Sequence, residues 1–269
     1  MQNTARSTKP LFALTLATAL LAASLTQAAI VTIQQDDFEA QTPGADLDGS
    51  GTDISGWSWM AGAGTAADTG DDITIADSGS NKYIDVHPAT PDYAPDWVFF
   101  NMDTSVAFAD IDTKLVLEAD ARMVDSDANM SINIGLDNKK RYAITVIEDG
   151  TNDTIELFAR DKDNGNRNEQ LDDATGDLGV EGVLNYELHY TPSTNYLEVY
   201  VDDSLLLSAT DSTGIDFTGD DMFAIFGAGD GQNFTLDNAL YTNGVIPEPA
   251  SASLLLLGVA ALCARRRRR

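Results

Sequence analysis

Apolar and polar side chains alternate through the middle of the chain. Between Lys114 and Val124, every second residue is apolar: Leu115, Leu117, Ala119, Ala121 and Met123. The same period of two recurs in residues 130–136, 184–190 and 197–201. This period is the repeat of a β-strand that buries one face. These segments therefore predict strands, and no segment between residues 29 and 245 has a sustained helical period.

Shorter apolar segments predict further strands, and turn residues separate most of them. The additional strands are expected at residues 30–34, 73–76, 82–86, 97–102, 141–148, 154–160, 205–209, 222–227 and 233–241. Between them lie turn sequences such as Asp149-Gly150, Asp163-Asn164-Gly165 and Asp202-Asp203. Many short strands with closely spaced turns are typical of an all-β fold. We therefore predict an antiparallel β-sandwich of the jelly-roll type over residues 29–245.

The first 28 residues have a different pattern. Arg6 and Lys9 precede an apolar run of 15 residues, 11–25, and small residues follow it up to Ala28. This order of charge, apolar core and small residues is that of a secretory signal peptide. The run is shorter than the ~20 residues that a membrane span requires. Residues 1–28 are thus predicted to form a signal helix that directs export.

The last residues form a second separate segment, 246–269. It begins with Pro247, Glu248 and Pro249, continues as an apolar stretch over residues 250–264, and ends in five arginines. The arginines are Arg265, Arg266, Arg267, Arg268 and Arg269. Such a positive cluster stays on the cytoplasmic side of a membrane. The segment predicts a hydrophobic helix that inserts transiently into the membrane.

The order of these three parts at the C-terminus resembles the PEP-CTERM sorting signal of Gram-negative bacteria that make extracellular polysaccharide. The resemblance implies processing by an exosortase-type enzyme embedded in the membrane. It also implies a membrane-anchored intermediate and final delivery to the outer envelope or the extracellular matrix. The resemblance covers only the last 25 or so residues and says nothing about the chemistry of the preceding domain.

Charge narrows the choice of partners. The chain has 16 Lys and Arg against 43 Asp and Glu, which gives a net charge of −27. Seven of the basic residues lie in the two terminal segments, so residues 29–249 hold 9 basic against 43 acidic residues. Nucleic acid is excluded as a partner, because binding it requires many Lys and Arg on phosphates. The scarcity of basic residues also argues against a catalytic site for a polyanionic substrate.

Several short motifs resemble those of laminin G-like and concanavalin A-like jelly rolls. They are the strand–turn–strand sequence from Leu184 to Asp202, the opening residues Asp36 to Glu39 and the closing residues Phe234 to Asn238. Members of these families bind sugars, hydrolyse them or act in adhesion. The resemblance therefore implies the fold and leaves the function open.

Calcium is the predicted cofactor. The only cysteine, Cys263, lies in the C-terminal segment, so the acidic domain has no disulfide. Ca²⁺ prefers carboxylate oxygens, and it would offset the charge repulsion. Some jelly-roll relatives hold a structural calcium where the first and last strands pair. By that resemblance the candidate ligands here are Asp37, Glu39 and Asp237.

Aromatic residues supply the candidate sugar-binding site. Sugars bind against aromatic faces with nearby carboxylate or amide groups. Tyr196, Glu198 and Tyr200 alternate with the core positions of one predicted strand, and Trp57 and Trp59 lie in a segment expected to be a loop. These five residues are the candidate ligand-binding residues, with an extracellular polysaccharide as the expected partner.

The sequence favours a non-enzymatic structural or carbohydrate-binding protein. A glycoside hydrolase or lyase of the same fold remains the alternative. Hydrolysis requires two carboxylates about 5–9.5 Å apart. Glu118-Ala119-Asp120 resembles the start of the Glu-x-Asp motif of laminarinase-like enzymes, but no second Glu follows it.

Overall fold

The computed structural model describes residues 30–45, 47, 54–59, 72–87, 98–111, 113–125, 128–137, 139–150, 152–229 and 233–244. The described residues hold sixteen strands and one short 3-10 helix, Phe108–Asp110 (η1). All the strands belong to one compact unit, Val31–Gly244. No helix in these ranges has the length and hydrophobicity that crossing a bilayer requires. The two terminal helices expected from the sequence lie outside the described residues.

Eight strands form the first sheet, sheet A. Their order is β14-β13-β12-β7-β16-β4-β3, and β1 pairs with β16 as well. In chain order their bounds are β1 Val31–Asp36, β3 Asp72–Asp77, β4 Lys82–His87, β7 Leu115–Met123, β12 Leu184–Thr191, β13 Tyr196–Val201, β14 Ser204–Thr210 and β16 Phe234–Asn243.

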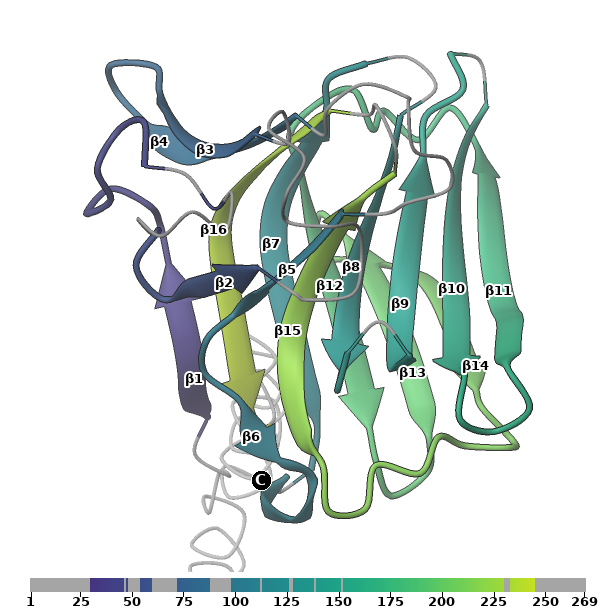
Figure 1. Cartoon of the computed structure of the whole chain (residues 1–269). Coiled ribbons are helices and arrows are strands. Elements are labelled where there is room, and N and C mark those ends of the chain that lie inside the picture. The colour runs from purple at the N-terminus through teal and green to yellow at the C-terminus, as the bar shows by residue number, and fades with distance from the viewer. Residues whose placement is uncertain are drawn as a thin grey trace, which may run out of the picture. The chain divides into compact units, whose positions relative to one another are not determined.

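The second sheet, sheet B, also has eight strands. Their order is β11-β10-β9-β8-β15-β5-β2, and β6 pairs with β15. Their bounds are β2 Trp57–Trp59, β5 Val98–Met102, β6 Val106–Ala107, β8 Asn129–Gly135, β9 Lys140–Ile147, β10 Asp153–Asp161, β11 Arg167–Gly176 and β15 Asp221–Ala228. Strands β9 to β11 lie in front of β12 to β14 in Figure 1. The described strands all pair antiparallel, so the fold is the predicted all-β sandwich.

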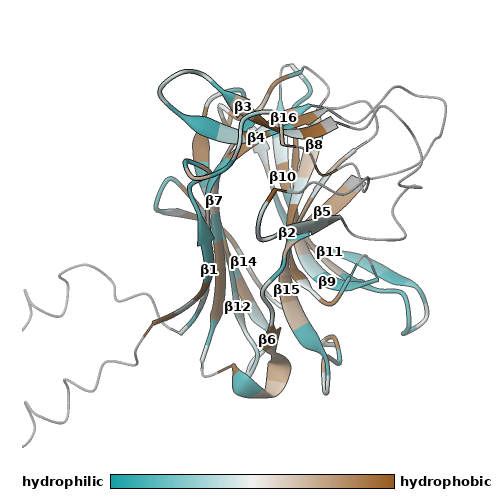
Figure 2. Ribbon diagram, turned by 60° about the vertical axis from the view of Figure 1, so that its left-hand side comes forward, coloured by the Kyte–Doolittle hydropathy of each residue, from teal (hydrophilic) through white to brown (hydrophobic). Residues whose placement is uncertain are grey.

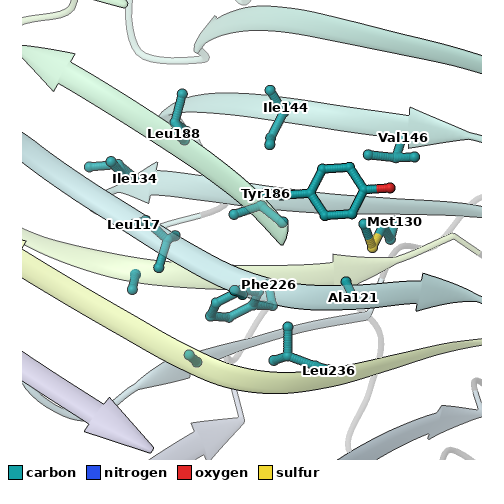
Figure 3. Packing of buried hydrophobic residues seen from close by; sticks show 14 of the residues in the cluster. Leu117, Ala121, Met130, Ile134, Ile144, Val146, Tyr186, Leu188, Phe226 and Leu236 are labelled. Carbon is teal, nitrogen blue, oxygen red and sulfur yellow. The ribbon is translucent and has the colours of Figure 1, made fainter. Parts of the chain in front are cut away.

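The core lies between the two sheets. The five alternate apolar residues of β7 are at most 2% exposed, which confirms their predicted inward face. Figure 3 shows side chains of both sheets meeting there. Those from sheet A include Leu117, Ala121, Tyr186, Leu188 and Leu236, and those from sheet B include Met130, Ile134, Ile144, Val146 and Phe226. The alternation along each strand thus fixes which residues remain on the outside.

The hairpin between β13 and β14 shows how the acidic turns form. Val201 pairs with Ser204, which leaves Asp202 and Asp203 as a two-residue loop. Both have positive φ angles, 48° and 61°. This is the pattern of a type I′ turn, whose twist matches that of the flanking strands, and Asp tolerates it better than most residues. The predicted Asp202-Asp203 turn is confirmed.

Strands β2 and β11 were not expected from the sequence. Strand β2 falls in the segment interpreted as a loop, and its three residues pair with β5. Strand β11 is an edge strand of sheet B that makes nine pairs with β10, and most of its own residues are polar. Figure 2 shows its hydrophilic character along most of its length. An exposed edge strand needs no apolar alternation, so the sequence pattern could not reveal it.

Candidate functional site

A groove lies on the outer face of sheet B, away from the core. On β8, Ile132 enters the core, so its neighbours Ser131 and Asn133 point outward. The groove has a volume of about 250 Å³ and extends across β8, β9, β10 and the start of β11. Six of its lining side chains carry most of its polar chemistry: Asn129, Ser131, Asn133, Arg141, Glu156 and Arg160.

Asn133 places an amide on the floor of the groove. Its side chain is fully buried, and its Nδ2 donates hydrogen bonds to Ser131 Oγ and to the carbonyl oxygen of Ile225, both at 3.0 Å. The amide oxygen, Oδ1, is buried and accepts no hydrogen bond from any described residue. A buried acceptor without a partner costs about 1–3 kcal/mol. A ligand hydroxyl or amide that donated to this oxygen would recover that energy.

Arg141 places a guanidinium beside this amide. The residue is 5% exposed, and its guanidinium carbon lies 4.4 Å from the centre of the Phe99 ring. Its Nε and Nη1 are buried without a hydrogen-bond partner among the described residues. The side chain starts from β9, and Phe99 belongs to β5, so Arg141 extends over β8 and β15. Arg141 therefore holds two buried, unbonded donors near the middle of the sheet.

Gly135 makes this path of Arg141 possible. The two residues are directly opposite each other on β8 and β9. A Cβ atom at Gly135 would lie 2.3 Å from the carbonyl oxygen of Lys140 and 2.5 Å from Cβ of Arg141. Such distances require the backbone to move, so the glycine allows the close approach of the two strands at this point.

Apolar side chains border the polar groups. Phe99 and Ile225 are 3% and 0% exposed although they lie on the outer face, and Phe223 packs against them. On the other side of the groove, Phe158 of β10 is half-buried and contributes an aromatic ring to the lining. The groove thus combines apolar surfaces with a few convergent polar groups, as ligand-binding pockets do.

The charges in the groove are separated along β10. Arg160 lies at one end, directly opposite Arg141, and Glu156 lies four residues away on the same face. Burial and the nearby charge of Arg160 hold the pKa of Arg141 well below its usual value. Burial and the nearby Asp173 raise the pKa of Glu156. One end of the groove is therefore cationic and the other end holds a single carboxyl group.

The structure places Trp57 in the core. Its indole is 4% exposed and packs against the rings of Phe38, Phe100 and Phe226 at centroid distances of 5.4–5.8 Å. Its Nε1 donates to Asp36 Oδ2 at 2.9 Å. Trp57 thus closes the edge of the core and has no ring face open to a sugar. The side chain of Trp59, like the sorting residues Pro247 to Arg269, lies outside the described residues.

Tyr196, Glu198 and Tyr200 share the outer face of sheet A, on the opposite side of the sandwich from the groove. Glu198 Oε2 accepts from Lys114 Nζ at 2.5 Å, and Tyr200 donates to Glu198 Oε1 at 3.3 Å. The ring of Tyr200 lies 4.7 Å from that of His189. The predicted residues are thus brought together, but Glu198 is already bonded within the protein.

The three predicted metal ligands have other partners. Glu39 Oε1 accepts from the backbone N–H of Lys82, and Asp237 Oδ2 accepts from Asn81 Nδ2 at 2.7 Å. Asp37 Oδ1 accepts from the N–H of Glu39. Across the described residues, no three His, Cys, Asp or Glu side chains form a group able to hold a metal ion. Calcium binding stays a prediction.

Glu118 and Asp120 also face outward from sheet A. Asn185 Nδ2 donates to both carboxylates, at 3.1 and 2.9 Å. Burial raises the pKa of Glu118, against the effect of the Asn185 hydrogen bond, and Glu187 raises it further. The pair therefore lies on the face opposite the groove, where a shared amide holds it.

The groove residues were missed by the sequence interpretation, although the chain contains a signal for them. Six of the nine basic residues between 29 and 249 lie within residues 139–167, and two of them, Arg141 and Arg160, line the groove. When an acidic domain concentrates its few basic residues in two or three neighbouring strands, the pattern indicates that positive charge is needed at that place on the surface. The net charge of the domain hides this concentration.

Two solved structures with TM-scores above 0.5 share the jelly-roll sandwich. An endo-1,3-beta-glucanase from Streptomyces sioyaensis has a TM-score of 0.53 and 10% identity, over 80% of this chain and 96% of that one. A Bacteroides ovatus GH16 protein in complex with a G4G4G3G product has a TM-score of 0.51 and 11% identity, over 77% and 99%. The Bacillus subtilis carbohydrate-binding module CBM66 has a TM-score of 0.43 and 16% identity, over 68% and 93%.

The comparison with curated proteins finds no match. The scan against family models matches residues 245–269 to the PEP-CTERM protein-sorting motif, which confirms the resemblance drawn from Pro247, Glu248, Pro249 and the terminal arginines. This motif indicates an exported, envelope-anchored protein of Gram-negative bacteria. The chain therefore combines a jelly-roll domain with a PEP-CTERM sorting signal.

Proposed function

We propose that this chain is a carbohydrate-binding protein of the outer envelope or extracellular matrix, and that the groove of sheet B holds the sugar. The observation that carries the proposal is the set of buried, unpartnered polar atoms at the floor of the groove, Asn133 Oδ1 and Arg141 Nε and Nη1. Protein interiors seldom leave such atoms unbonded, so their burial in residues that line an open groove favours a polar ligand.

A sugar fits this combination of groups. Its hydroxyls both donate and accept, so one sugar unit can donate to Asn133 Oδ1 and accept from Arg141. Its apolar ring face can pack on the half-buried ring of Phe158. The volume of about 250 Å³ lies near the lower limit of small-molecule pockets, which suits a short segment of a sugar chain. The glucan-active enzymes with this fold support the same ligand class by analogy of fold alone.

Binding is better supported than hydrolysis. Glycoside hydrolysis by the usual route requires two carboxyl groups flanking the scissile bond. Among the described residues that line the groove, Glu156 is the one carboxylate. The groove therefore offers contacts that can hold a sugar. It offers one carboxyl group for acid–base chemistry, where hydrolysis requires two.

The sorting motif supplies the location of this activity. We propose that an exosortase-type enzyme processes the chain at its C-terminal segment, after a transient insertion of the apolar residues 250–264 into the membrane. The jelly-roll domain would then contact extracellular polysaccharide from an anchored position. Such a protein would link the envelope to the surrounding polymer.

Two matched substitutions test which face binds. Polysaccharide affinity of the full-length chain is measured by affinity electrophoresis for wild type, Phe158→Ala in the groove, and Tyr196→Ala on sheet A. Loss of an aromatic contact should weaken binding by at least about fivefold for Phe158→Ala, and Tyr196→Ala should bind like wild type. A loss confined to Tyr196→Ala would move the site to sheet A. If no polysaccharide retards the wild type, the proposal is wrong.

A further inference from the structure

Two arginines face each other across neighbouring strands in the groove. Arg141 of β9 and Arg160 of β10 are direct cross-strand partners, and both line the groove. Like charges directly opposite each other destabilise a sheet. Burial of Arg141, a residue that is 5% exposed, adds a desolvation cost. The nearby carboxylate of Asp137 offsets part of the effect of Arg160 on Arg141. The arrangement is therefore unfavourable without a further negative charge.

Three other partly buried cations contact a carboxylate directly: Lys114 with Glu198, Lys140 with Asp220 and Arg167 with Asp211. Within the described part of the chain, neither Arg141 nor Arg160 has a carboxylate within ion-pair distance. The described residues include many carboxylates, yet none of them pairs with these two arginines, which points to a countercharge that comes from outside.

We propose that the groove selects an acidic polysaccharide, with the carboxylate of a uronic acid unit bound between Arg141 and Arg160. This inference rests on the proposed carbohydrate binding and narrows its ligand class. A carboxylate suits the planar, multiply donating guanidinium group, and charge-assisted hydrogen bonds of this kind are about twice as strong as neutral ones. The scarcity of cations noted in the sequence argues against catalysis on a polyanion, but two arginines are enough to bind one carboxylate.

Glu156 limits where the carboxylate of the ligand can lie in the groove, because like charges repel. It is four residues from Arg160 along β10, which corresponds to about 13 Å in an extended strand. A carboxylate at the Arg141 end would thus be well separated from Glu156, whose side chain can accept hydrogen bonds from neutral hydroxyls of the same chain. The groove therefore suits a polymer that presents one acidic group against the arginines and hydroxyls elsewhere.

The net charge of the domain separates this binding from simple ion exchange. With 9 basic and 43 acidic residues over positions 29–249, the surface as a whole repels a polyanion. Binding must then come from the groove itself. Buried pairs are screened by salt much less than exposed ones, so binding should persist in about 0.5 M salt.

The test compares one polymer with and without its carboxylates. Full-length protein is titrated calorimetrically with oligogalacturonate, with oligomannuronate, and with the same oligomers after reduction of each carboxylate to a primary alcohol. We expect binding of at least one acidic oligomer and a loss of roughly 10- to 100-fold on reduction, the size expected for hydrogen bonds to a charged group. Dextran sulfate tests whether any anionic sugar suffices.

Three substitutions, each of which removes one positive charge, test which arginines bind the carboxylate of the oligomer. Arg160→Gln and Arg141→Gln in the groove should each weaken binding of the acidic oligomer roughly 10- to 100-fold. Arg160→Gln should leave binding of the reduced oligomer within about twofold, whereas Arg141→Gln should weaken that binding as well, because Arg141 also donates to sugar hydroxyls. Arg122→Gln is the matched control, because Arg122 is exposed on sheet A and donates to the carbonyl oxygen of Glu181. It should bind like wild type. Arg160 is only half-buried, so Arg160→Gln tests the proposal even if Arg141→Gln fails to fold.

The outcomes separate this inference from the proposed function. Equal affinity for the acidic and reduced oligomers, or no effect of Arg160→Gln, would overturn the acidic ligand while leaving carbohydrate binding intact. Binding of dextran sulfate without binding of either uronate would overturn the carboxylate assignment. Binding of no sugar polymer at all would overturn both proposals.

Discussion

Two buried tyrosines differ in what their hydroxyl groups contact. Both Tyr142 and Tyr186 are fully buried. The hydroxyl of Tyr142 donates to Asp211 Oδ2 at 2.9 Å and accepts from the N–H of Ile215 at 3.2 Å. The hydroxyl of Tyr186, which Figure 3 shows among apolar side chains, is buried without a partner in the described part of the chain. The two residues therefore test the energetic value of a satisfied and an unsatisfied hydroxyl within one core.

Replacing each tyrosine by phenylalanine should destabilise the protein in one case only. Tyr142→Phe leaves a buried carboxylate and an N–H short of a bond, so we expect the free energy of unfolding to fall by about 1–3 kcal/mol. Tyr186→Phe removes a group that burial leaves unsatisfied, so we expect no loss, or a gain of up to about 1 kcal/mol. Urea unfolding measures both. A larger loss for Tyr186→Phe than for Tyr142→Phe would contradict this assignment.

Individual side chains were the hardest features to predict from the sequence. Tyr196, Glu198 and Tyr200 were correctly placed on one outer face, because strand alternation determines that much. The alternation does not tell which of the two sheets is hollowed, and Trp57 gave no sign that its indole would bond to Asp36 in the core. Asn133 and Arg141 look like ordinary outward residues in the sequence. Their burial depends on contacts with distant strands.

At the level of elements, one ion pair connects an edge strand to a long loop. Arg167 begins β11, and its guanidinium donates to both oxygens of Asp211, at 2.6 and 2.9 Å. The same carboxylate accepts from the N–H groups of Thr213 and Gly214. These contacts hold the connection between β14 and β15 against the end of β11.

The same contacts determine how Asp211 responds to pH. Burial pushes the pKa of Asp211 up, but the hydrogen bonds from Arg167, Gly214 and Tyr142 outweigh it, so the pKa lies below its usual value. A carboxyl group with a depressed pKa stabilises the folded state above its unfolded-state pKa, about 3.9. This contribution is lost as the pH falls through the folded-state pKa.

Asp211→Asn should therefore be destabilised at neutral pH and less so in acid. Removing one partner of a buried ion pair costs about 3–5 kcal/mol, which is the expected loss at pH 7. The difference from wild type should narrow once the pH falls below about 4, because wild type then loses the same charge. Urea unfolding at neutral and acidic pH measures it. Asp163→Asn, at a 64% exposed side chain 4.0 Å from Lys140, is the control and should change stability by less than about 0.5 kcal/mol at either pH.

Strands with a buried face were the elements that the sequence predicted best. Segments such as 114–124 and 184–190 became β7 and β12, within a residue at each end. Strand β11 was missed because its ten residues, from Arg167 to Gly176, are mainly polar. Its position is fixed by backbone pairing with β10 and by contacts such as the hydrogen bond from the N–H of Ser208 to Asp172. Such long-range contacts leave no periodic pattern.

At the scale of the whole molecule, charge is distributed unevenly among three regions: the terminal segments, residues 139–167 and the rest of the domain. The terminal basic residues belong to the predicted signal segment and to the sorting segment, and most of the domain's own cations lie in residues 139–167. The remaining surface is acidic. This separation explains how one chain can repel polyanions in general and still present two arginines in a groove. It also means that the folded domain bears a strong self-repulsion, which depends on the surrounding salt.

Salt should therefore stabilise the domain without any specific ion. Raising NaCl from about 0.01 M to about 1 M shortens the screening length from roughly 30 Å to about 3 Å, which weakens repulsion among 43 acidic residues. We expect the free energy of unfolding to rise by about 1–2 kcal/mol and the thermal midpoint by roughly 2–8 °C. Calorimetry in NaCl and KCl should give equal shifts. CaCl₂ at matched ionic strength tests the calcium prediction, because a bound ion adds a shift that a chelator reverses. A midpoint that falls with NaCl would show that repulsion does not limit stability here.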